Sequence, residues 1–357
     1  MKRRSANRLF LALSWAGLVV IAGLPFGGWL RWMTMPDRDL DLLVYDSTVF
    51  ESDRRQHNGV GLMMKYLKVP FDNATDYVGS SPGGRPFGTW PAERPDLVML
   101  VDAYGVYVND QADLDPNGEV RITPSFPRSH ALDVIRWADE GSVIMGEFNM
   151  MHEPTDPATS ELLQGVFGID ATGWTGRAYQ DLQEVTPVVQ RLHPGTWDYG
   201  GPGIVLVGST VGDRAIDPGL VVLLPEHLNA LAPRVLSDED PEYPDIALNS
   251  WFALIEADSA ADTTLWINLP VNDRGAALLE AKGIALRSPF LVWNDNTVYA
   301  AGSLASTPAA FPARRIVGAL PVMERLFAAG DAAMFYRVFA PLVERLVTMA
   351  EQEQVEE

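Results

Sequence analysis

The chain begins with a long apolar segment. Residues 9–30 carry no charged side chain, and about 20 apolar residues in a helix cross a hydrocarbon core of about 30 Å. Four basic residues precede this segment and a stretch rich in Pro and Asp follows it. This asymmetry predicts a cytoplasmic N-terminus at residues 1–8, a transmembrane helix at residues 9–31, and a main domain outside the cytoplasm. Trp29 and Trp32 stand at the far end of the helix, where interfacial rings settle.

A cleaved signal peptide is the alternative interpretation of this segment. Residues 20–22 (Val-Ile-Ala) form a small-residue cleavage site. The apolar run continues past this site to Trp29 and is longer than the apolar region of most signal peptides. We therefore favour the uncleaved anchor.

After residue 40 the pattern alternates between buried strands and helices. Short, continuous apolar runs at 42–45, 97–101 and 142–145 are typical of parallel strands that are buried on both faces. Helical spacing lies between them at 60–67, and again from a Ser cap at residue 129 to a Gly stop at residue 141. The order of strand and helix predicts an α/β fold, with a mainly parallel sheet and helices on both of its faces.

The second half is less regular and predicts an antiparallel extension of the sheet. Its apolar runs, bounded by Gly and Pro or partly alternating, are residues 203–207, 220–224, 253–257 and 264–269. A closing hairpin is expected around Asn294–Asn296. Further helices are predicted at 272–282, 315–328 and 332–350. We place one extracytoplasmic domain at residues 41–350 and a flexible acidic tail at residues 351–357.

Composition narrows the classes of function. The net charge of −20 repels nucleic acid, so no nucleic-acid partner is expected. Since there is no cysteine, a lipoprotein anchor, disulfides, thiolate metal sites and a cysteine nucleophile are all excluded. The 47% of hydrophobic residues is typical of a globular domain.

Polar side chains gather where the predicted parallel strands end, which is where ligands bind in such sheets. Asp46 ends the first strand, with Arg54 and His57 leading into the next helix. Asp102 and Tyr104 follow the second strand, and Glu147 follows the third. These groups are candidates for ligand binding, and the acids Glu147, Asp102 and Asp46 are candidates for catalysis. Each also has a structural interpretation, as a turn cap, a loop anchor or a member of an ion pair.

A second polar patch, at residues 172–181, contains two glycines, Trp174, Arg177 and Tyr179. In a loop, these side chains could stack on a sugar ring or hold a carboxylate. An ordered loop with Trp174 buried beneath it is the structural alternative.

The motifs of common cofactor sites are missing. The five histidines have no metal-ligand spacing, and phosphate loops, dinucleotide fingerprints and Gly-x-Ser-x-Gly turns are absent. We expect no cofactor and no metal.

The region 42–149 resembles the class I glutamine amidotransferase-like fold, a flavodoxin-like parallel sheet. Residues 96–105 are similar to the strand that leads to the oxyanion loop of that fold, and residues 131–146 to its helix and strand before the nucleophile turn. The whole chain also resembles a bacterial family with one N-terminal membrane helix and such an exported domain. That second resemblance is carried by residues 45–49, 54–57, 173–177 and 301–302.

The nucleophile turn departs from the amidotransferase pattern. The family requires a cysteine there, whereas Gly146 is followed by Glu147 and Phe148, so hydrolysis of glutamine through a thioester is impossible. Cysteine-free relatives of the fold often serve as binding or assembly domains, so the resemblance implies architecture and not activity.

Together these features predict a single-pass protein of the bacterial plasma membrane. The bilayer contacts residues 9–31, and the external domain is a non-catalytic module of the cell envelope that binds a carbohydrate or a membrane or envelope protein. One alternative is a hydrolase that acts on a glycan and uses Glu147 with Asp46 or Asp102 as a carboxylate pair. Another is a purely structural component of a membrane complex.

Overall fold

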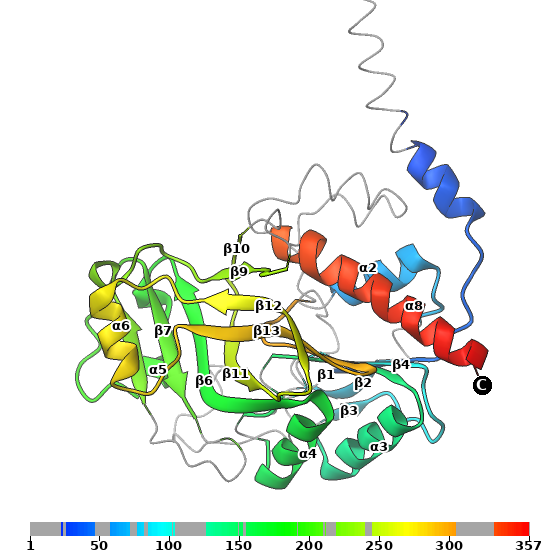
Figure 1. The fold of residues 1–357 in the computed structure, drawn as a ribbon, viewed down its shortest axis with the longest axis horizontal. Coiled ribbons are helices and arrows are strands. Elements are labelled where there is room, and N and C mark those ends of the chain that lie inside the picture. The colour runs from blue at the N-terminus through cyan, green and yellow to red at the C-terminus, as the bar shows by residue number, and fades with distance from the viewer. Residues whose placement is uncertain are drawn as a thin grey trace, which may run out of the picture.

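A mixed sheet of ten strands and a separate antiparallel sheet of four strands organise the molecule (Figure 1). The structure is a computed structural model. It describes residues 23, 26–46, 58–71, 77–81, 85–101, 103, 126–148, 150–152, 155–190, 192–209, 211, 219–239, 245–304 and 332–356. The predicted α/β class is confirmed.

Five parallel strands form the centre of the larger sheet. In spatial order they are β14 (Thr297–Ala300), β5 (Val143–Glu147), β4 (Leu97–Leu100), β1 (Leu42–Asp46) and β2 (Tyr77–Ser81). Every residue of β1, β4, β5 and β14 is buried, which explains why their sequences are continuous apolar runs and do not alternate.

Antiparallel strands extend this sheet at both edges. Beyond β14 lie β13 (Arg287–Asn294), β12 (Asp262–Asn268), β9 (Arg234–Leu236) and β10 (Ile246–Ala247). Of the two partly alternating runs predicted to extend the sheet, residues 264–269 lie here, mostly in β12, whereas residues 253–257 belong to the separate four-stranded sheet, and β9 and β10 were not predicted. The predicted hairpin joins β13 to β14, and Asp295 adopts a φ of 52° in its turn. At the other edge, β3 (Arg85–Phe87) pairs with β2.

The second sheet was not predicted as a separate unit. It contains β11 (Phe252–Ala257), β6 (Ile169–Tyr179), β7 (Gly203–Gly208) and β8 (Leu220–Leu223), in that spatial order. The prediction of a loop at residues 172–181 is wrong, because most of this segment lies in β6.

Close packing explains why a segment with two glycines is a strand. A Cβ atom on Gly176 would lie 2.4 Å from the Phe252 ring and 2.5 Å from Leu206, so the missing side chain lets both neighbours pack directly against the backbone. The glycine therefore permits a close contact and does not signal a turn.

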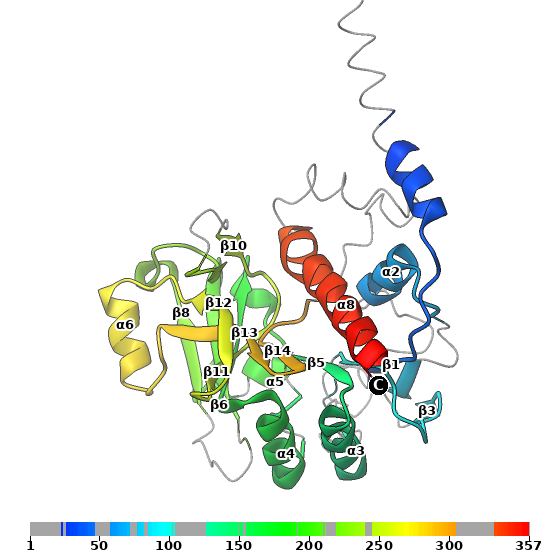
Figure 2. The same cartoon turned by 45° about the vertical axis from the view of Figure 1, so that its right-hand side comes forward.

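Helices cover both faces of the parallel sheet, as predicted. α2 (Asn58–Leu67) and α8 (Ala340–Glu356) lie on one face, and α3 (Arg128–Asp139) and α4 (Pro157–Phe167) lie on the other (Figures 1 and 2). The shorter helical segments are α5 (Pro187–Gln190), α6 (Asp273–Glu280), two 3₁₀ turns at Leu182–Glu184 and Pro225–His227, and a π-helical segment at Phe335–Phe339. The helix predicted at 315–328 lies outside the described residues.

The helix ends test the predicted caps. Asn272 caps α6, since its Oδ1 accepts hydrogen bonds from the backbone N–H groups of Arg274 (3.0 Å) and Gly275 (3.2 Å). Ser129 was expected to cap α3, but it lies within the first turn, and Pro127 occupies the N-cap position. The first turn is instead closed by the Pro127 carbonyl, which accepts hydrogen bonds from the backbone N–H groups of His130 (2.9 Å) and Ala131 (3.1 Å).

The predicted tail is part of a helix. α8 continues through Glu356, and two of its last residues contact the segment before β1. Glu351 forms an ion pair with Arg38 at 2.6 Å, and the Gln354 amide donates to the Asp39 carbonyl at 3.1 Å and to the Asp96 carboxylate at 2.8 Å. These contacts give the acidic C-terminal segment a structural role that its charge did not suggest.

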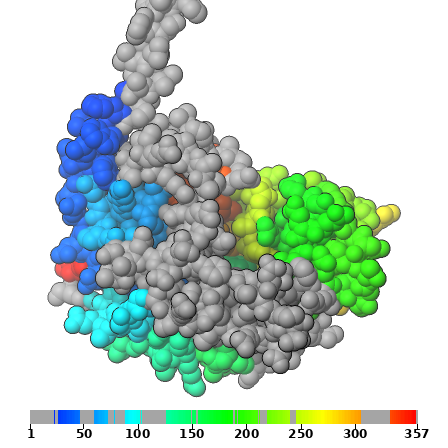
Figure 3. All heavy atoms as spheres, turned by 180° about the vertical axis from the view of Figure 1, so that it is seen from behind, coloured from blue at the N-terminus to red at the C-terminus, as the bar shows by residue number. Residues whose placement is uncertain are grey.

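Most of the predicted transmembrane helix lies outside the described residues. Its last part belongs to a helix at residues 26–34, whose atoms lie at the edge of the molecule next to α2 (Figure 3). Within the part of the chain that the structure describes, no helix is both long enough and apolar enough to cross a membrane.

Gly146 at the end of β5 provides a test of this packing. A Cβ atom there would lie 2.6 Å from the Phe167 ring and 2.8 Å from the Met150 sulfur. We expect Gly146→Ala to lower the free energy of unfolding by about 1–3 kcal/mol through overpacking, as measured by urea denaturation. Gly165→Ala is the matched control, because that helical glycine has open space around it and should gain up to about 1 kcal/mol. Equal effects of the two substitutions would contradict the packing described here.

Candidate functional site

The site predicted at the carboxyl ends of the parallel strands brings Asp46 and Glu147 to one edge of the sheet. Tyr45 pairs with Leu100 and Leu100 pairs with Gly146, so the two acids follow at the same level on β1 and β5. With β4 between them, their Cα atoms are separated by two strand spacings, roughly 10 Å.

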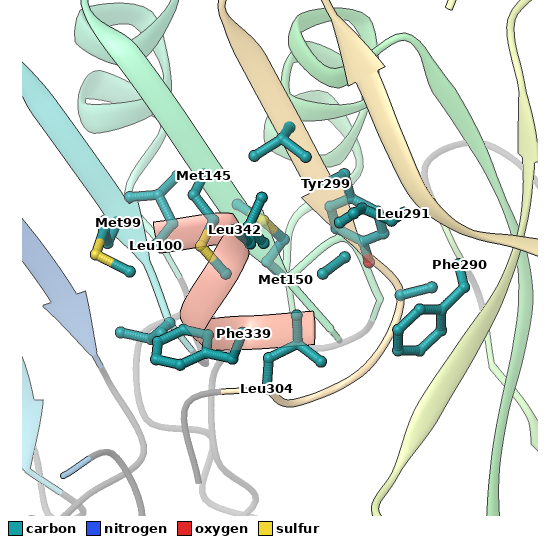
Figure 4. Packing of buried hydrophobic residues seen from close by; sticks show 14 of the residues in the cluster. Met99, Leu100, Met145, Met150, Phe290, Leu291, Tyr299, Leu304, Phe339 and Leu342 are labelled. Carbon is teal, nitrogen blue, oxygen red and sulfur yellow. The ribbon is translucent and has the colours of Figure 1, made fainter. Parts of the chain in front are cut away.

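Both acids point to the face of the sheet that packs against α8. Side chains alternate along a strand, so Asp46 and Glu147 share a face with Met99 and Met145. Figure 4 shows these two methionines on the side where Phe339 and Leu342 approach from the C-terminal helices. Asp46 and Glu147 are each 0% exposed, so neither carboxylate meets solvent directly.

Glu147 has identified structural contacts. Its Oε2 accepts a hydrogen bond from the backbone N–H of Leu304 at 3.2 Å, which ties the end of β5 to the segment after β14. Its charge also contributes to the raised pKa of Tyr299, although burial of the phenol is the larger cause. The glutamate therefore helps to fix the chain at this edge.

The turn that follows β5 is strained. Phe148 has a φ of 52°, which is unfavourable for a bulky side chain, and it is buried with 4% exposure. Its N–H donates to the Ala300 carbonyl at 2.8 Å, and its own carbonyl accepts a hydrogen bond from the Tyr299 hydroxyl. These contacts hold the backbone in the left-handed region.

This turn shares two features of a nucleophile elbow, a positive φ and a closely packed glycine, but it lacks the nucleophile. In such elbows a sharp strand-to-helix turn presents a reactive side chain, whereas here the next helix, α4, begins only at Pro157. Here Gly146 provides the close packing and Phe148 occupies the strained position. A phenyl ring has no nucleophilic atom, so covalent catalysis from this position is excluded.

His152 lies a few residues after this turn and is 1% exposed. Neither of its ring nitrogens has a hydrogen-bond partner in the structure that is described. Burial lowers the pKa of this imidazole to about 4, so the ring is neutral at pH 7. Among the described residues, no group of three or more histidines and acids is arranged to hold a metal ion.

The polar patch at 172–181 divides into a buried and a half-buried part. Trp174 is 5% exposed and its ring packs against Gly208 in the main core, which matches the structural alternative for this residue. Arg177 is half-buried, and its guanidinium carbon lies 5.1 Å from the centre of the Tyr179 ring. Only the arginine therefore retains a position from which it could bind a ligand.

Arg177, Tyr179 and Trp251 form a cluster that we call the Arg177 cluster. The Tyr179 ring meets Trp251 edge-on, with centroids 6.4 Å apart. Within the described ranges, no carboxylate forms an ion pair with Arg177, and Arg177 Nε has no hydrogen-bond partner. Burial raises the pKa of Tyr179, and the positive charge of Arg177 and a hydrogen bond with its side chain oppose that shift. A guanidinium beside a phenolic donor is suited to bind an anionic oxygen.

Backbone contacts link the Arg177 cluster to the carboxyl edge of the parallel sheet. Phe252, next to Trp251, forms an isolated bridge with Gly302 just after β14, and two residues further on Leu304 donates to Glu147. The other candidates, Arg54, His57, Asp102 and Tyr104, lie outside the described residues.

Sequence reasoning counted Tyr179 in this patch but missed Trp251. Trp251 could not be found from the sequence, since only the pairing of β6 with β11 brings it near.

A cavity of about 270 Å³ lies elsewhere, at the amino ends of β1 and β4. Asp41, Glu93, Arg94 and three prolines are among the residues that line it. It is thus separated from Asp46 and Glu147 by the length of the strands.

Comparisons with known proteins add little to this geometry. No family model matches the chain, and no curated protein matches it. Among solved structures, a glutamine amidotransferase from Thermotoga maritima aligns over 89% of this chain and 94% of its own, with 11% identity and a TM-score of 0.30. At this level of similarity, function has to be inferred from the residues of this chain.

The buried imidazole of His152 predicts a pH-dependent stability. Between pH 6.5 and 4 the unfolded chain binds a proton at this residue and the folded chain does not, so stability falls as the pH falls through this window. At pH 5, the neutral state of His152 in the fold lowers the free energy of unfolding by about 2 kcal/mol relative to pH 7. Urea denaturation of the parent and of His152→Gln at pH 7 and pH 5 measures it. The variant should lose less stability than the parent on acidification, and parallel losses would contradict the prediction.

Proposed function

We propose that this protein is a single-pass, membrane-anchored extracytoplasmic protein whose amidotransferase-like domain binds a ligand or a partner in the cell envelope without covalent catalysis. The observation that carries the proposal is the turn after β5, where Phe148 occupies a strained, nucleophile-type position. Strain of this kind persists where the surrounding structure enforces it, and it concentrates at functional sites. A retained turn with an inert side chain is what a binding module derived from such a fold would contain.

The proposal of a membrane anchor rests on the amino-acid sequence. A charge-free run at residues 9–30, preceded by basic residues, favours insertion with the domain outside. The absence of cysteine from all 357 residues is compatible with an oxidising exterior, since no thiol is present to be damaged.

The alternative, a glycan hydrolase with a carboxylate pair, is less well supported. The separation of roughly 10 Å between the Cα atoms of Asp46 and Glu147 would suit an inverting pair if their side chains lined an open cleft. Both side chains are fully buried, and Glu147 accepts a backbone hydrogen bond. A general acid has to reach the glycosidic oxygen, so this burial favours a structural role.

The Arg177 cluster favours an anionic ligand. In a protein of net charge −20, a half-buried guanidinium with no carboxylate partner among the described residues is a local positive site. A carboxylate on an acidic sugar or on a partner protein could accept hydrogen bonds from Arg177, while Trp251 supplies an apolar ring.

Two measurements test the location. A reporter fused after Glu357 should be active only outside the cytoplasm, and mass spectrometry of the mature protein should retain residues 1–30. A reporter active in the cytoplasm, or a mature chain that begins after residue 22, would overturn the anchored arrangement.

Affinity purification of the full-length protein from membranes tests the function. We expect co-purification of an envelope glycan or protein, and a severalfold loss of that material in Arg177→Gln because the ligand loses its cationic contact. Glu147→Gln is the control: it keeps an acceptor for the Leu304 N–H and should retain the ligand as the parent does.

The same pair of variants discriminates against the hydrolase. If Glu147→Gln accumulates an uncleaved glycan that the parent turns over, Glu147 is catalytic and the binding-module proposal fails. Thermal unfolding of both variants checks that any loss of ligand is not a loss of fold.

A further inference from the structure

The helix at residues 26–34 has an exposed apolar face. Phe26 is 61% exposed, Trp29 40%, Leu30 50% and Met33 52%. Their positions, i, i+3, i+4 and i+7, place the four side chains on a single stripe of the helix. We call these four residues the apolar stripe.

Trp32 lies off the stripe and binds the domain. Its indole Nε1 donates to the Tyr66 carbonyl at 2.9 Å and to the Lys65 carbonyl at 3.2 Å, at the C-terminal end of α2. The Lys68 ammonium lies 4.3 Å from the centre of its ring. Trp32 was expected to settle at the membrane interface, but these contacts commit it to the domain.

The residues between the helix and β1 are also held. The Arg38 N–H donates to the Lys68 carbonyl at 2.9 Å, and its side chain pairs with Glu351 of α8 at 2.6 Å. Asp37 lies 3.7 Å from the Lys68 ammonium, and Leu40 is only 4% exposed. The segment is therefore attached to both α2 and α8 and does not act as a free linker.

These attachments lie at the amino edge of the parallel sheet. The Gln354 amide binds Asp96, which directly precedes β4, and the backbone N–H of Asp41 donates to the same carboxylate at 2.7 Å just before β1. Asp46 and Glu147 end their strands at the opposite edge.

We propose that the apolar stripe lies in the outer interface of the lipid bilayer and that the Trp32 and Arg38 contacts hold the domain in one orientation on the membrane. The carboxyl edge of the parallel sheet is then the edge remote from the points of attachment. This inference rests on the proposed membrane anchor.

The sequence favours the lipid bilayer as the partner that contacts the apolar stripe. The last five residues of the charge-free run at residues 9–30 form the first part of this helix, so an anchor that crosses the membrane delivers the stripe to the interface. Trp29 lies within the stripe, and aromatic rings are enriched at that depth. A protein of net charge −20 gains no general attraction to anionic lipids, so apolar contact has to supply the affinity.

Single-cysteine spin labels test the position of the stripe, because the natural chain contains no cysteine. Full-length Leu30→Cys and Met33→Cys are labelled in nanodiscs of phosphatidylcholine and phosphatidylglycerol, with Arg31→Cys as the exposed control off the stripe. Accessibility to oxygen relative to a water-soluble nickel chelate should be severalfold higher at 30 and 33 than at 31. Equal aqueous accessibility at all three positions would overturn the proposal, as would strong coupling between labels on two copies, which would assign the stripe to a dimer.

Distance measurements test the fixed orientation. Electron–electron dipolar spectroscopy between labels at Met33→Cys and Gln352→Cys should give one narrow distribution in the nanodisc. Trp32→Ala should broaden it, whereas Trp197→Ala, which removes a tryptophan from the region of the four-stranded sheet, should not. A distance distribution that is broad before the substitution, or unchanged by Trp32→Ala, would overturn the proposal that these contacts fix the orientation of the domain.

The failure of the anchor is distinguishable from the failure of this inference. If the mature protein lacks residues 1–22 and does not reconstitute into nanodiscs, the membrane proposal itself is wrong. If it reconstitutes and the labels at 30 and 33 report water, the anchor stands and only the docked orientation is lost.

Discussion

The complete burial of the central parallel strands constrains the rest of this structure. Four of these strands, β1, β4, β5 and β14, expose none of their residues, so helices have to cover both faces of the sheet. Polar chemistry is then confined to the positions where the strands end. Asp46 and Glu147 occupy two such ends, and even there both side chains are 0% exposed.

The same burial determines the conformation of the turn after β5. Gly146 has no room for a Cβ atom beneath Phe167 and Met150, and the chain has to leave the sheet sharply after Glu147. Hydrogen bonds from Phe148 to Ala300 and from Tyr299 to Phe148 hold the resulting positive φ. The strain is thus maintained by neighbouring strands and does not need a catalytic residue to justify it.

The segment at residues 26–40 is attached at the opposite edge of the parallel sheet. The ion pair of Arg38 with Glu351 joins residues that are 313 positions apart in the sequence. The hydrogen bond from Trp32 to Tyr66 of α2 joins residues that are 34 positions apart. Contacts of this range join the two ends of the chain, and they explain why the acidic C-terminal residues extend α8 where a frayed tail was expected. In the proposed arrangement, one edge of the sheet serves attachment and the other recognition.

The sequence by itself determined the elements whose signal is local. Continuous apolar runs identified β1, β4 and β5, Asn272 identified the start of α6, and the turn at Asn294–Asn296 identified the hairpin of β13 and β14, because burial and capping leave a pattern within a few residues. Glu147 was singled out for the same reason, as a charged residue at the end of a buried strand. Only the tertiary structure decided that residues 172–179 belong to a strand, that Trp174 is core while Arg177 is available, and that Trp32 binds α2. Each of these depends on a partner far away in the chain, such as Phe252 for Gly176 or Tyr66 for Trp32, and no local pattern encodes which distant surface a side chain will meet.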